Sequence, residues 1–516
     1  MVESVPVTAA RRRIIVVEWG HRMGFRPTIR RIALVTPPYH SGVVETAGSW
    51  PNAAFVYLAG ALRAAGFDPV IYDAMTANHD MAEIASELER IRPDMVVTTA
   101  YTSSYPKAAD LLRLAKQTLP EVVTGVGGVH AHFMYEEILT RDADAVDIVF
   151  RGEGERTLPE TVECLNAGDD LAKVKGIAFR DESGVVVTPV RPFVADLDSL
   201  PTAWDLVDWS LYQFYPMPDT KLAIISTSRG CDQACTFCSQ QAFWCRTWRA
   251  RSAENVVAEI EMLRDRFGVG VVMFSDETPT LDPHRWRRLL DLLIEREVDS
   301  HLLMETRVDD VLRDRAIMPL YRAAGIRHIY VGVERTDQAS LDLFKKNTKV
   351  SMGKEAIDLI NSHDMISETS FVLGLPDDTK ETIRATFDLA QHYDPDLGFF
   401  LTISPWPYAD MYEDLKPYIV SYDYEDYNLV APVVKPKAMT TDELMKEIID
   451  CYRRFYMGKL KRIPSMSPFK RDYFLVTMKL LMENSYLKQY MGGLGKMPAE
   501  VAALVSGLKT SASSRS

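Results

Sequence analysis

Three cysteines lie close together in the stretch CDQACTFCSQQ, which begins at Cys231. Cys231, Cys235 and Cys238 have the spacing C-x3-C-x2-C, directly after an apolar run that reads as a strand. Three thiolates at close range can ligate three irons of a four-iron, four-sulfur (4Fe-4S) cluster and leave the fourth iron open to an outside ligand. The spacing therefore predicts an open cluster, with the aromatic Phe237 beside it as a further cofactor contact.

Two other metal sites are compatible with these thiols. Zinc prefers four ligands and usually binds C-x2-C pairs, so a zinc site would need Cys245 as its fourth ligand. A closed cluster would also use Cys245. The chain has only six cysteines, and Cys164 and Cys451 are isolated, which is too sparse for a disulfide framework. The thiols therefore indicate a reducing compartment, and we expect the cytoplasm.

Composition limits the class of partner. Apolar residues make up 47% and charged residues 25% of the 516 residues, as in ordinary packed domains. The excess of 72 Asp+Glu over 59 Lys+Arg argues against nucleic acid as the main partner. No apolar run reaches the roughly 18 residues that a membrane span needs. We expect a small-molecule substrate, no nucleic acid and no transmembrane segment.

The elements that must position the cysteines follow an α/β rhythm. Residues 31–190 alternate apolar strands with helical periods, which predicts a doubly wound, flavodoxin-like parallel sheet closed by a hairpin. Such sheets bind ligands beyond the carboxyl ends of their strands. Residues 223–410 begin with a strand that runs into the cysteine loop, and they contain six strand–helix units, which predict a partial (β/α)6 barrel.

The remaining segments complete the expected domain organisation. The predicted boundaries are 1–30 for an Arg-rich extension, 31–190 for the first sheet, 191–222 for a linker, 223–410 for the barrel and 411–516 for a mainly helical C-terminal domain.

The stretch RGCDQACTFCS, placed after a strand and before a barrel, resembles the radical S-adenosylmethionine (SAM) superfamily. The resemblance implies that Cys231, Cys235 and Cys238 hold the cluster and that the open iron chelates SAM. An electron from the cluster then splits SAM to a 5′-deoxyadenosyl radical. An electron donor such as flavodoxin or ferredoxin is also implied.

The same resemblance implies contacts to SAM at later strand ends. FSDE ends the second barrel strand, where the family binds the amino group, so Asp276 or Glu277 is expected there, although the common Gly-Gly-Glu is missing. Arg307 is expected to meet the carboxylate, and Glu334 to accept hydrogen bonds from the ribose hydroxyls. The alternative for each is a structural ion pair at a strand end.

The first sheet resembles the cobalamin-binding domain of the cobalamin-dependent branch of this superfamily. The matching pieces are TTAYTSS, TGVGGVHAHF and RGEGE, in which glycines let the backbone approach a cofactor closely. The residues carried over as cobalamin contacts are Ser103, Gly127, Gly128, His130 and Glu153.

The D-x-H-x-x-G motif that places a His beneath cobalt is missing after the first strand. The segment TPPYHSGVVETAG stands there, with His40 but without that spacing. We therefore expect cobalamin to be held without a His ligand. His40, His130 and His132 are candidate pocket residues, and the alternative for each is an ordinary surface or capping His.

Longer motifs resemble one family, the anaerobic magnesium-protoporphyrin IX monomethyl ester cyclases. They include VGGVHAHFMYEEIL, FCSQQAFW and ISPWPYADMYEDL, and the similarity runs from about residue 31 to about residue 475. The resemblance implies closure of the fifth ring of bacteriochlorophyll as a cyclic ketone, with its oxygen from water. The alternatives are a cobalamin-dependent radical SAM C-methyltransferase acting on another small molecule, a sensor that binds these cofactors without turnover, and a zinc-binding interaction protein.

A flat magnesium porphyrin needs an apolar slot and a cation for its free propionate. Trp406 and Tyr408 are the candidates for the slot. The candidate cations lie in the basic C-terminal segment, for which a solvated helix face is the alternative. They are Lys459, Lys461, Arg462, Lys470 and Arg471.

Overall fold

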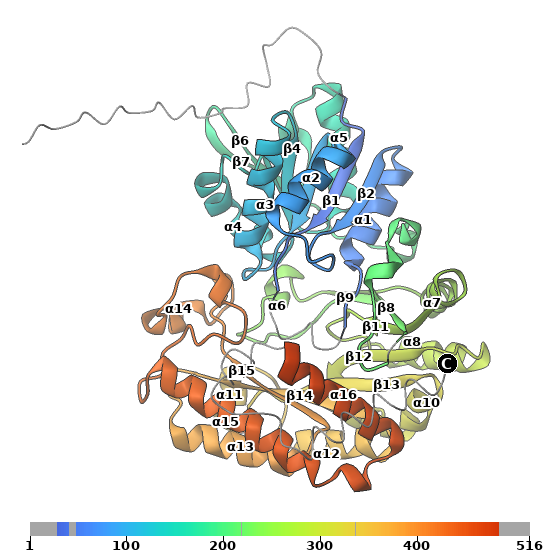
Figure 1. Cartoon of the computed structure of the whole chain (residues 1–516), viewed down its shortest axis with the longest axis vertical. Coiled ribbons are helices and arrows are strands. Elements are labelled where there is room, and N and C mark those ends of the chain that lie inside the picture. The colour runs from blue at the N-terminus through green and yellow to red at the C-terminus, as the bar shows by residue number, and fades with distance from the viewer. Residues whose placement is uncertain (1–27, 41–47, 218, 336, 485–516) are drawn as a thin grey trace, which may run out of the picture.

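In the computed structural model, two β-sheets built mainly of parallel strands lie one above the other (Figure 1). The structure describes residues 28–40, 48–217, 219–335 and 337–484, with side chains to residue 480. The predicted N-terminal extension falls almost entirely outside the described residues.

The N-terminal sheet has seven strands in the order β2-β1-β3-β4-β5-β6-β7. Its first five strands are parallel, and the last two form an antiparallel hairpin at the edge. The strands are β1 (Arg31–Thr36), β2 (Asp68–Asp73), β3 (Met95–Thr99), β4 (Val123–Gly127), β5 (Ile148–Phe150), β6 (Ile177–Asp181) and β7 (Gly184–Val187). The doubly wound sheet with a closing hairpin is confirmed.

Five helices cover both faces of this sheet. They are α1 (Ala53–Ala64), α2 (Met81–Ile91), α3 (Tyr105–Thr118), α4 (Val129–Arg141) and α5 (Gly154–Ala167). Helices α1 and α5 pack on one face and α2, α3 and α4 on the other, in two separate apolar clusters. The RGEGE segment follows β5, which ends at Phe150, and turns into α5 at Gly154.

The second sheet has six parallel strands in the order β15-β14-β13-β12-β11-β8. They are β8 (Lys221–Ile225), β11 (Val269–Phe274), β12 (His301–Arg307), β13 (Ile326–Gly332), β14 (Ile366–Leu373) and β15 (Leu397–Thr402). The connecting helices are α7 (Ala253–Phe267), α8 (Pro283–Glu295), α9 (Val308–Arg313), α10 (Met318–Ala323), α11 (Gln338–Leu343), α12 (Val350–Ser362) and α13 (Lys380–Tyr393). The sheet does not close on itself, so the prediction of a partial barrel is confirmed.

The chain between β8 and the cysteine loop departs from the sequence prediction of one continuous strand. It breaks after Ile225, and β9 (Ser228–Gly230) pairs instead with β10 (Trp248–Ala250), with the short helix α6 (Gln240–Phe243) between them. Gly230 has a φ of +92°, and a Cβ there would lie 2.1 Å from the carbonyl oxygen of Thr247. Only glycine fits this turn into the cysteine loop.

The C-terminal helices are α14 (Tyr412–Leu415), α15 (Thr441–Leu460) and α16 (Pro468–Asn484). Helix α15 packs on β15, where the ring centroids of Tyr452 and Phe400 lie 5.4 Å apart. Tyr473 of α16 forms a 2.8 Å hydrogen bond with His328 Nδ1 on β13. These helices therefore share the core of the barrel. Within the described residues, no helix is both long and apolar enough to cross a membrane.

Candidate functional site

Two adjoining cavities lie where the carboxyl ends of the two sheets meet. The first, here called the cluster cavity, has a volume of about 400 Å³ and contains the three clustered cysteines together with residues from the ends of β11, β12 and β13. The second, the sheet-edge cavity, has a volume of about 510 Å³ and lies between the ends of β1, β3 and β4 and the start of the barrel. Parallel sheets place ligands at this edge.

The structure brings Cys231, Cys235 and Cys238 together on the wall of the cluster cavity. Two backbone hydrogen bonds of Thr236 fix their loop. The Thr236 N–H donates to Phe344 O at 3.1 Å, and the Thr236 carbonyl accepts from the Met411 N–H at 3.1 Å.

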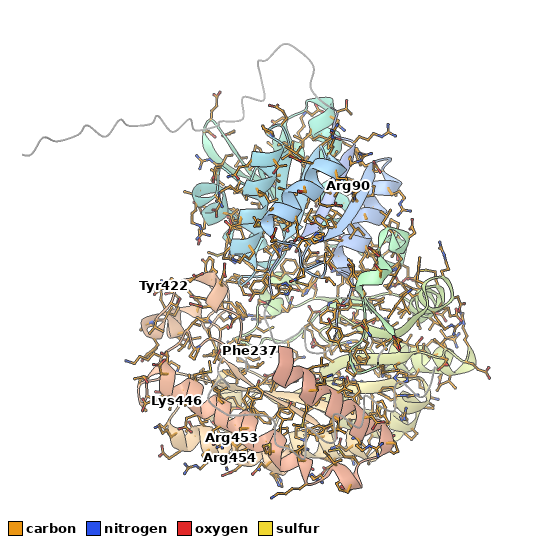
Figure 2. All side chains as sticks on the ribbon, viewed as in Figure 1. Arg90, Phe237, Tyr422, Lys446, Arg453 and Arg454 are labelled. Carbon is orange, nitrogen blue, oxygen red and sulfur yellow. The ribbon has the colours of Figure 1, made fainter. Side chains whose placement is uncertain are left out.

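Phe237 also lines the cluster cavity, and its ring centroid lies 4.7 Å from that of Phe344. In the view of Figure 2, Phe237 lies between the two sheets. The loop is therefore held from the barrel side and open toward the N-terminal domain.

The three thiols are largely buried, and this changes their acidity. Burial raises the pKa of Cys231 and Cys235, and it raises the pKa of Cys238 to about 12. Cationic iron offsets this cost, because a coordinated thiol is deprotonated. Cys245 is exposed and is not part of the cavity wall, so the geometry does not bring it to the other three.

The two strand-end carboxylates after β11 point in different directions. Asp276 is buried outside the cavity walls, where it accepts hydrogen bonds from the Thr227 hydroxyl at 2.7 Å and from the Ser228 N–H. Burial raises its pKa to about 6. Glu277 lines both cavities and accepts from the Gly230 N–H at 3.2 Å. Of the two candidates, Glu277 is therefore the one placed to meet a ligand.

Arg307 and Glu334 both line the cluster cavity. The Arg307 guanidinium lies 2.9 Å from Asp309, and the Glu334 carboxylate lies 2.6 Å from the Lys346 ammonium. Glu334 has a φ of +65°, a conformation that non-glycine residues adopt rarely and mostly at functional sites. Both residues therefore lie on the cavity wall, as predicted, and both also form the ion pair that the sequence analysis gave as the alternative to SAM binding.

Glu305 is a carboxylate that the sequence analysis missed. It lies two residues before Arg307 on β12, so both side chains are on the same face of the strand and both line the cluster cavity. Burial, followed by the nearby negative charge of Glu277, raises the pKa of Glu305 to about 8. The sequence HLLMETR could have indicated this position, because side chains two residues apart on a strand point to the same face and Arg307 was already predicted to lie in the site.

The wall of the sheet-edge cavity combines glycines with aromatic and apolar side chains. It contains four of the predicted cobalamin contacts, Ser103, Gly127, Gly128 and Glu153. The buried hydroxyls of Thr36 and Ser228 also lie on this wall, without a hydrogen-bond partner among the described residues. Open volume, glycine backbone and unsatisfied hydroxyls suit a large polar cofactor such as cobalamin.

The three histidines do not line either cavity. His40 is exposed. His130 is buried behind the cavity wall, where its Nδ1 lies 3.1 Å from the Thr102 hydroxyl, and burial lowers its pKa to about 3. His132 packs against Phe243, and burial lowers its pKa to about 4. The geometry therefore gives these side chains no direct place at a cofactor in the sheet-edge cavity.

Four residues belong to the walls of both cavities: Tyr101, Gln240, Ser275 and Glu277. Tyr101 was not singled out from TTAYTSS, although its side chain is 62% exposed to this space. Because the walls are shared, ligands in the two cavities would lie next to each other.

The basic C-terminal segment lies elsewhere. Lys459 and Arg462 pair with Asp394, and Lys470 lies 2.6 Å from Asp396. Both aspartates precede β15, at the end of the strand opposite the cysteine loop. In Figure 2, Arg453 and Arg454 on α15 likewise lie away from Phe237.

The other substrate candidates, Trp406 and Tyr408, are not part of either cavity wall. Tyr408 stacks on Phe133 with 4.6 Å between ring centroids, and Trp406 packs in the same apolar cluster as Phe237.

Comparisons with known proteins agree with this division into two cofactor regions. Residues 39–162 match the family model described as B12 binding domain, and residues 225–390 match the one described as Radical SAM superfamily. The matches cover the whole wall of the cluster cavity, and the wall of the sheet-edge cavity apart from Thr36, Pro37 and Ile224.

Curated relatives share both regions. The chain is 38% identical over 461 residues to the anaerobic magnesium-protoporphyrin IX monomethyl ester cyclase of Cereibacter sphaeroides, covering 88% of this chain and 75% of the relative. It is 36% identical over 467 residues to the enzyme of the same name from Rubrivivax gelatinosus, covering 89% and 84%. It is 27% identical over 405 residues to the hopanoid C-3 methylase of Methylococcus capsulatus, covering 77% and 75%.

A solved structure has the same fold. The cobalamin-dependent S-adenosylmethionine radical enzyme OxsB, with aqua-cobalamin and S-adenosylmethionine bound, matches with a TM-score of 0.68 at 17% identity, covering 94% of this chain and 75% of that one.

Proposed function

The chain belongs to the family of anaerobic magnesium-protoporphyrin IX monomethyl ester cyclases and is a cobalamin-dependent radical SAM enzyme, and from this premise we propose that it closes a ring on a magnesium tetrapyrrole. The observation that carries the proposal is the identity of 38% and 36% over nearly nine-tenths of the chain.

The cofactors supply, when bound, a carbon radical that removes hydrogen from an unactivated C–H bond, and a cobalt centre beside it. The residues of this chain hold and orient them. Cys231, Cys235 and Cys238 ligate the cluster. Glu277 meets the SAM ammonium and Arg307 its carboxylate, because a charged partner strengthens each hydrogen bond.

Glu334 accepts from the ribose of SAM in the same proposal. It stands beside Lys346 and Gly332, and a Cβ at Gly332 would lie 2.6 Å from both the Glu334 Oε1 and the Lys346 Nζ. The lack of a side chain at Gly332 therefore leaves room for the pair to reach the cavity.

The substrate slot lies on the aromatic side of the cluster cavity. Phe237, Trp406 and Tyr408 are each partly exposed and present rings of the kind that a flat macrocycle packs against. The basic C-terminal residues are not used, because Lys459 and Lys470 are engaged with aspartates at the opposite end of β15.

An external reductant and a reducing compartment complete the proposal. The cluster must receive an electron in each cycle, and a flavodoxin or ferredoxin is the donor class that we propose. Thiolates on an iron–sulfur cluster need protection from oxidation, so we place the enzyme in the cytoplasm.

The test is an anaerobic reaction with the full chain. Protein reconstituted with iron, sulfide and cobalamin is incubated with SAM, a reductant and magnesium-protoporphyrin IX monomethyl ester, and the products are followed by mass spectrometry. We expect a fifth-ring ketone together with 5′-deoxyadenosine, and oxygen-18 from labelled water in the ketone. 5′-Deoxyadenosine with unchanged porphyrin would overturn the substrate proposal while leaving the radical enzyme in place.

A second candidate is C-methyl transfer to another small molecule. It is favoured by the 27% identity to a methylase over 405 residues and by the shared walls of the two cavities, which place cobalamin next to SAM. Its signature is S-adenosylhomocysteine formed alongside 5′-deoxyadenosine. A porphyrin product heavier by one CH2 in accurate mass, as distinct from the nominally equal gain of one oxygen and loss of two hydrogens in a ketone, would also assign methyl transfer.

A further inference from the structure

The β9–β10 hairpin lies between the two cofactor regions and leads directly into the cluster ligands. Its first strand ends at Gly230, one residue before Cys231. In Figure 1, β9 lies in the narrow region between the N-terminal sheet and the barrel. Because the hairpin is covalently joined to the cysteine loop, a shift of the hairpin relative to either domain also shifts the loop.

Arg229 of β9 forms two charged contacts with the N-terminal domain. Its Nη1 donates to Glu153 Oε1 at 2.7 Å, and its Nη2 donates to Glu155 Oε1 at 2.6 Å. The three side chains are 11%, 5% and 7% exposed. Both carboxylates lie at the N-terminus of α5, directly after β5.

Arg249 of β10 forms a second ion pair with Glu153. Its Nη1 lies 3.0 Å from Glu153 Oε1. The other oxygen of Glu153 accepts from the Val194 N–H at 2.6 Å, so the start of the interdomain segment joins the network. Arg249 also stacks on Phe193, with 4.7 Å from its guanidinium carbon to the ring centroid.

The barrel holds the hairpin from the other side. The Gly230 N–H donates to Glu277 at 3.2 Å, and the Ser228 N–H donates to Asp276. The hairpin is thus fixed between carboxylates that follow β11 of the barrel and carboxylates that follow β5 of the N-terminal sheet. Four acidic residues from two domains meet on one strand of three residues.

Buried ion pairs of this kind contribute little net stability, because desolvation of the charges offsets their attraction. Their best-supported role is to select one geometry over others. The guanidinium fork reinforces this selection, because two parallel N–H groups fix direction as well as distance.

We propose that Arg229, with Glu153 and Glu155, is a positioning joint that fixes the cobalamin-binding domain at one distance from the cluster loop. Arg229 and Glu153 lie on the wall of the sheet-edge cavity, and Cys231 lies on that of the cluster cavity. The joint therefore connects the two cofactor sites through two residues of backbone. It goes beyond the proposed function because it holds whichever substrate the enzyme uses.

The test measures geometry rather than turnover. Full-length Arg229→Met and Glu155→Gln are loaded with cob(II)alamin and with the reduced cluster, and pulsed EPR measures the distance distribution between the cobalt and cluster spins. Lys470→Met is the matched control, because it removes an equally buried ion pair, with Asp396, far from the hairpin.

We expect both cofactors to bind at wild-type stoichiometry in all three variants. The width of the distance distribution should at least double in Arg229→Met and increase less in Glu155→Gln, which keeps a neutral acceptor. It should be unchanged in Lys470→Met. If Arg229→Met does not fold, Glu155→Gln decides the outcome alone.

An unchanged distribution in Arg229→Met, or in Glu155→Gln where that variant decides, would overturn the proposal. Equal broadening in Lys470→Met would overturn it as well, since the effect would then be general loosening. Loss of cobalamin with retained cluster in Glu155→Gln would assign these carboxylates to cofactor binding instead of positioning.

Discussion

The cluster cavity and the sheet-edge cavity share four wall residues but are built by different means. The cluster cavity places three thiols and three carboxylates, Glu277, Glu305 and Glu334, around about 400 Å³. The sheet-edge cavity presents backbone at Gly127, Gly128, Gly152 and Gly154 around about 510 Å³. We expect the cluster cavity to bind through its ionisable side chains, and the sheet-edge cavity to depend on close approach of the main chain at these glycines.

This difference predicts opposite sensitivities to mutation. Removing a side chain should damage the cluster cavity, because each group there has a ligand or a charge to meet. Adding a side chain should damage the sheet-edge cavity, because a Cβ takes up space that the cofactor needs.

The largest effect is expected from Cys235→Ala. Loss of one of the three thiolates should abolish cluster binding and lower 5′-deoxyadenosine formation at least about 1,000-fold. Iron content and the visible absorption of the reconstituted protein measure the first, and product analysis the second. Cys245→Ala is the control, because Cys245 is exposed and outside both cavities. Equal loss of iron in Cys245→Ala would show a fourth protein ligand.

Gly128→Ala tests the wall of the sheet-edge cavity. Gly128 has a φ of +94°, and a Cβ there would lie 2.6 Å from Ala100 O. We expect cobalamin affinity to fall about 10- to 100-fold, since a misplaced loop after β3 narrows the cavity. Equilibrium titration monitored by cobalamin absorbance measures it.

Gly66→Ala separates crowding from backbone strain. Gly66 has a similar φ of +90°, but no atom lies within 4 Å of a Cβ placed there. It should lose only about 1 kcal/mol of stability and keep its cobalamin affinity. Equal affinity loss in both variants would refute a specific role for Gly128.

Glu277→Gln distinguishes the two carboxylates that follow β11. Only Glu277 faces the cavities, so its neutralisation should raise the Kd of SAM about 10-fold, as expected for one charge-assisted hydrogen bond. Asp276→Asn should change the Kd less than about twofold and lower thermal stability instead, because Asp276 accepts internal hydrogen bonds. Isothermal titration measures the Kd of SAM, and thermal melts measure the stability. The reverse pattern would assign SAM binding to Asp276.

Glu305→Gln has the smallest expected effect and tests the charge of the cluster cavity. The pKa of Glu305 rises from 4.5 to about 8 on folding, with burial as the main cause. The folded state therefore binds more protons than the unfolded chain between these values, and its stability falls as pH rises from 4.5 to about 8.

Glu305→Gln has no ionisable group at this position, so it does not lose folding stability over this pH range. We expect cofactor-free Glu305→Gln to be more stable than wild type by at least about 1 kcal/mol at pH 8 and equally stable near pH 4.5. Urea unfolding at the two pH values measures the difference. Parallel pH profiles for the two proteins would show that Glu305 is ionised in the folded protein.

Both sheets could be predicted because buried parallel strands read as short apolar runs between helical periods. The grouping of Cys231, Cys235 and Cys238 on one cavity wall could be predicted because they are neighbours in the chain. The break between β8 and β9 could not, since the pairing of Gly230 with Trp248 depends on the chain turning back after the cysteine loop.

Contacts between distant segments account for the other differences. The Arg229–Glu153 pair joins residues 76 positions apart, and the contact of Lys470 with Asp396 joins residues 74 positions apart. Neither leaves a periodic signal in the sequence. A basic segment near the C-terminus was therefore a candidate substrate contact in the sequence, whereas in the folded protein Lys459 and Lys470 pair with aspartates just before β15.

The most direct measurement is a crystal structure of the holoenzyme with anomalous data collected at the iron and cobalt edges. We predict iron density at Cys231, Cys235 and Cys238, cobalt density in the sheet-edge cavity, and the space between them bounded by Tyr101 and Glu277. Cobalt outside the sheet-edge cavity, or iron ligated by Cys245 as well, would contradict the assignment of two adjoining cofactor sites.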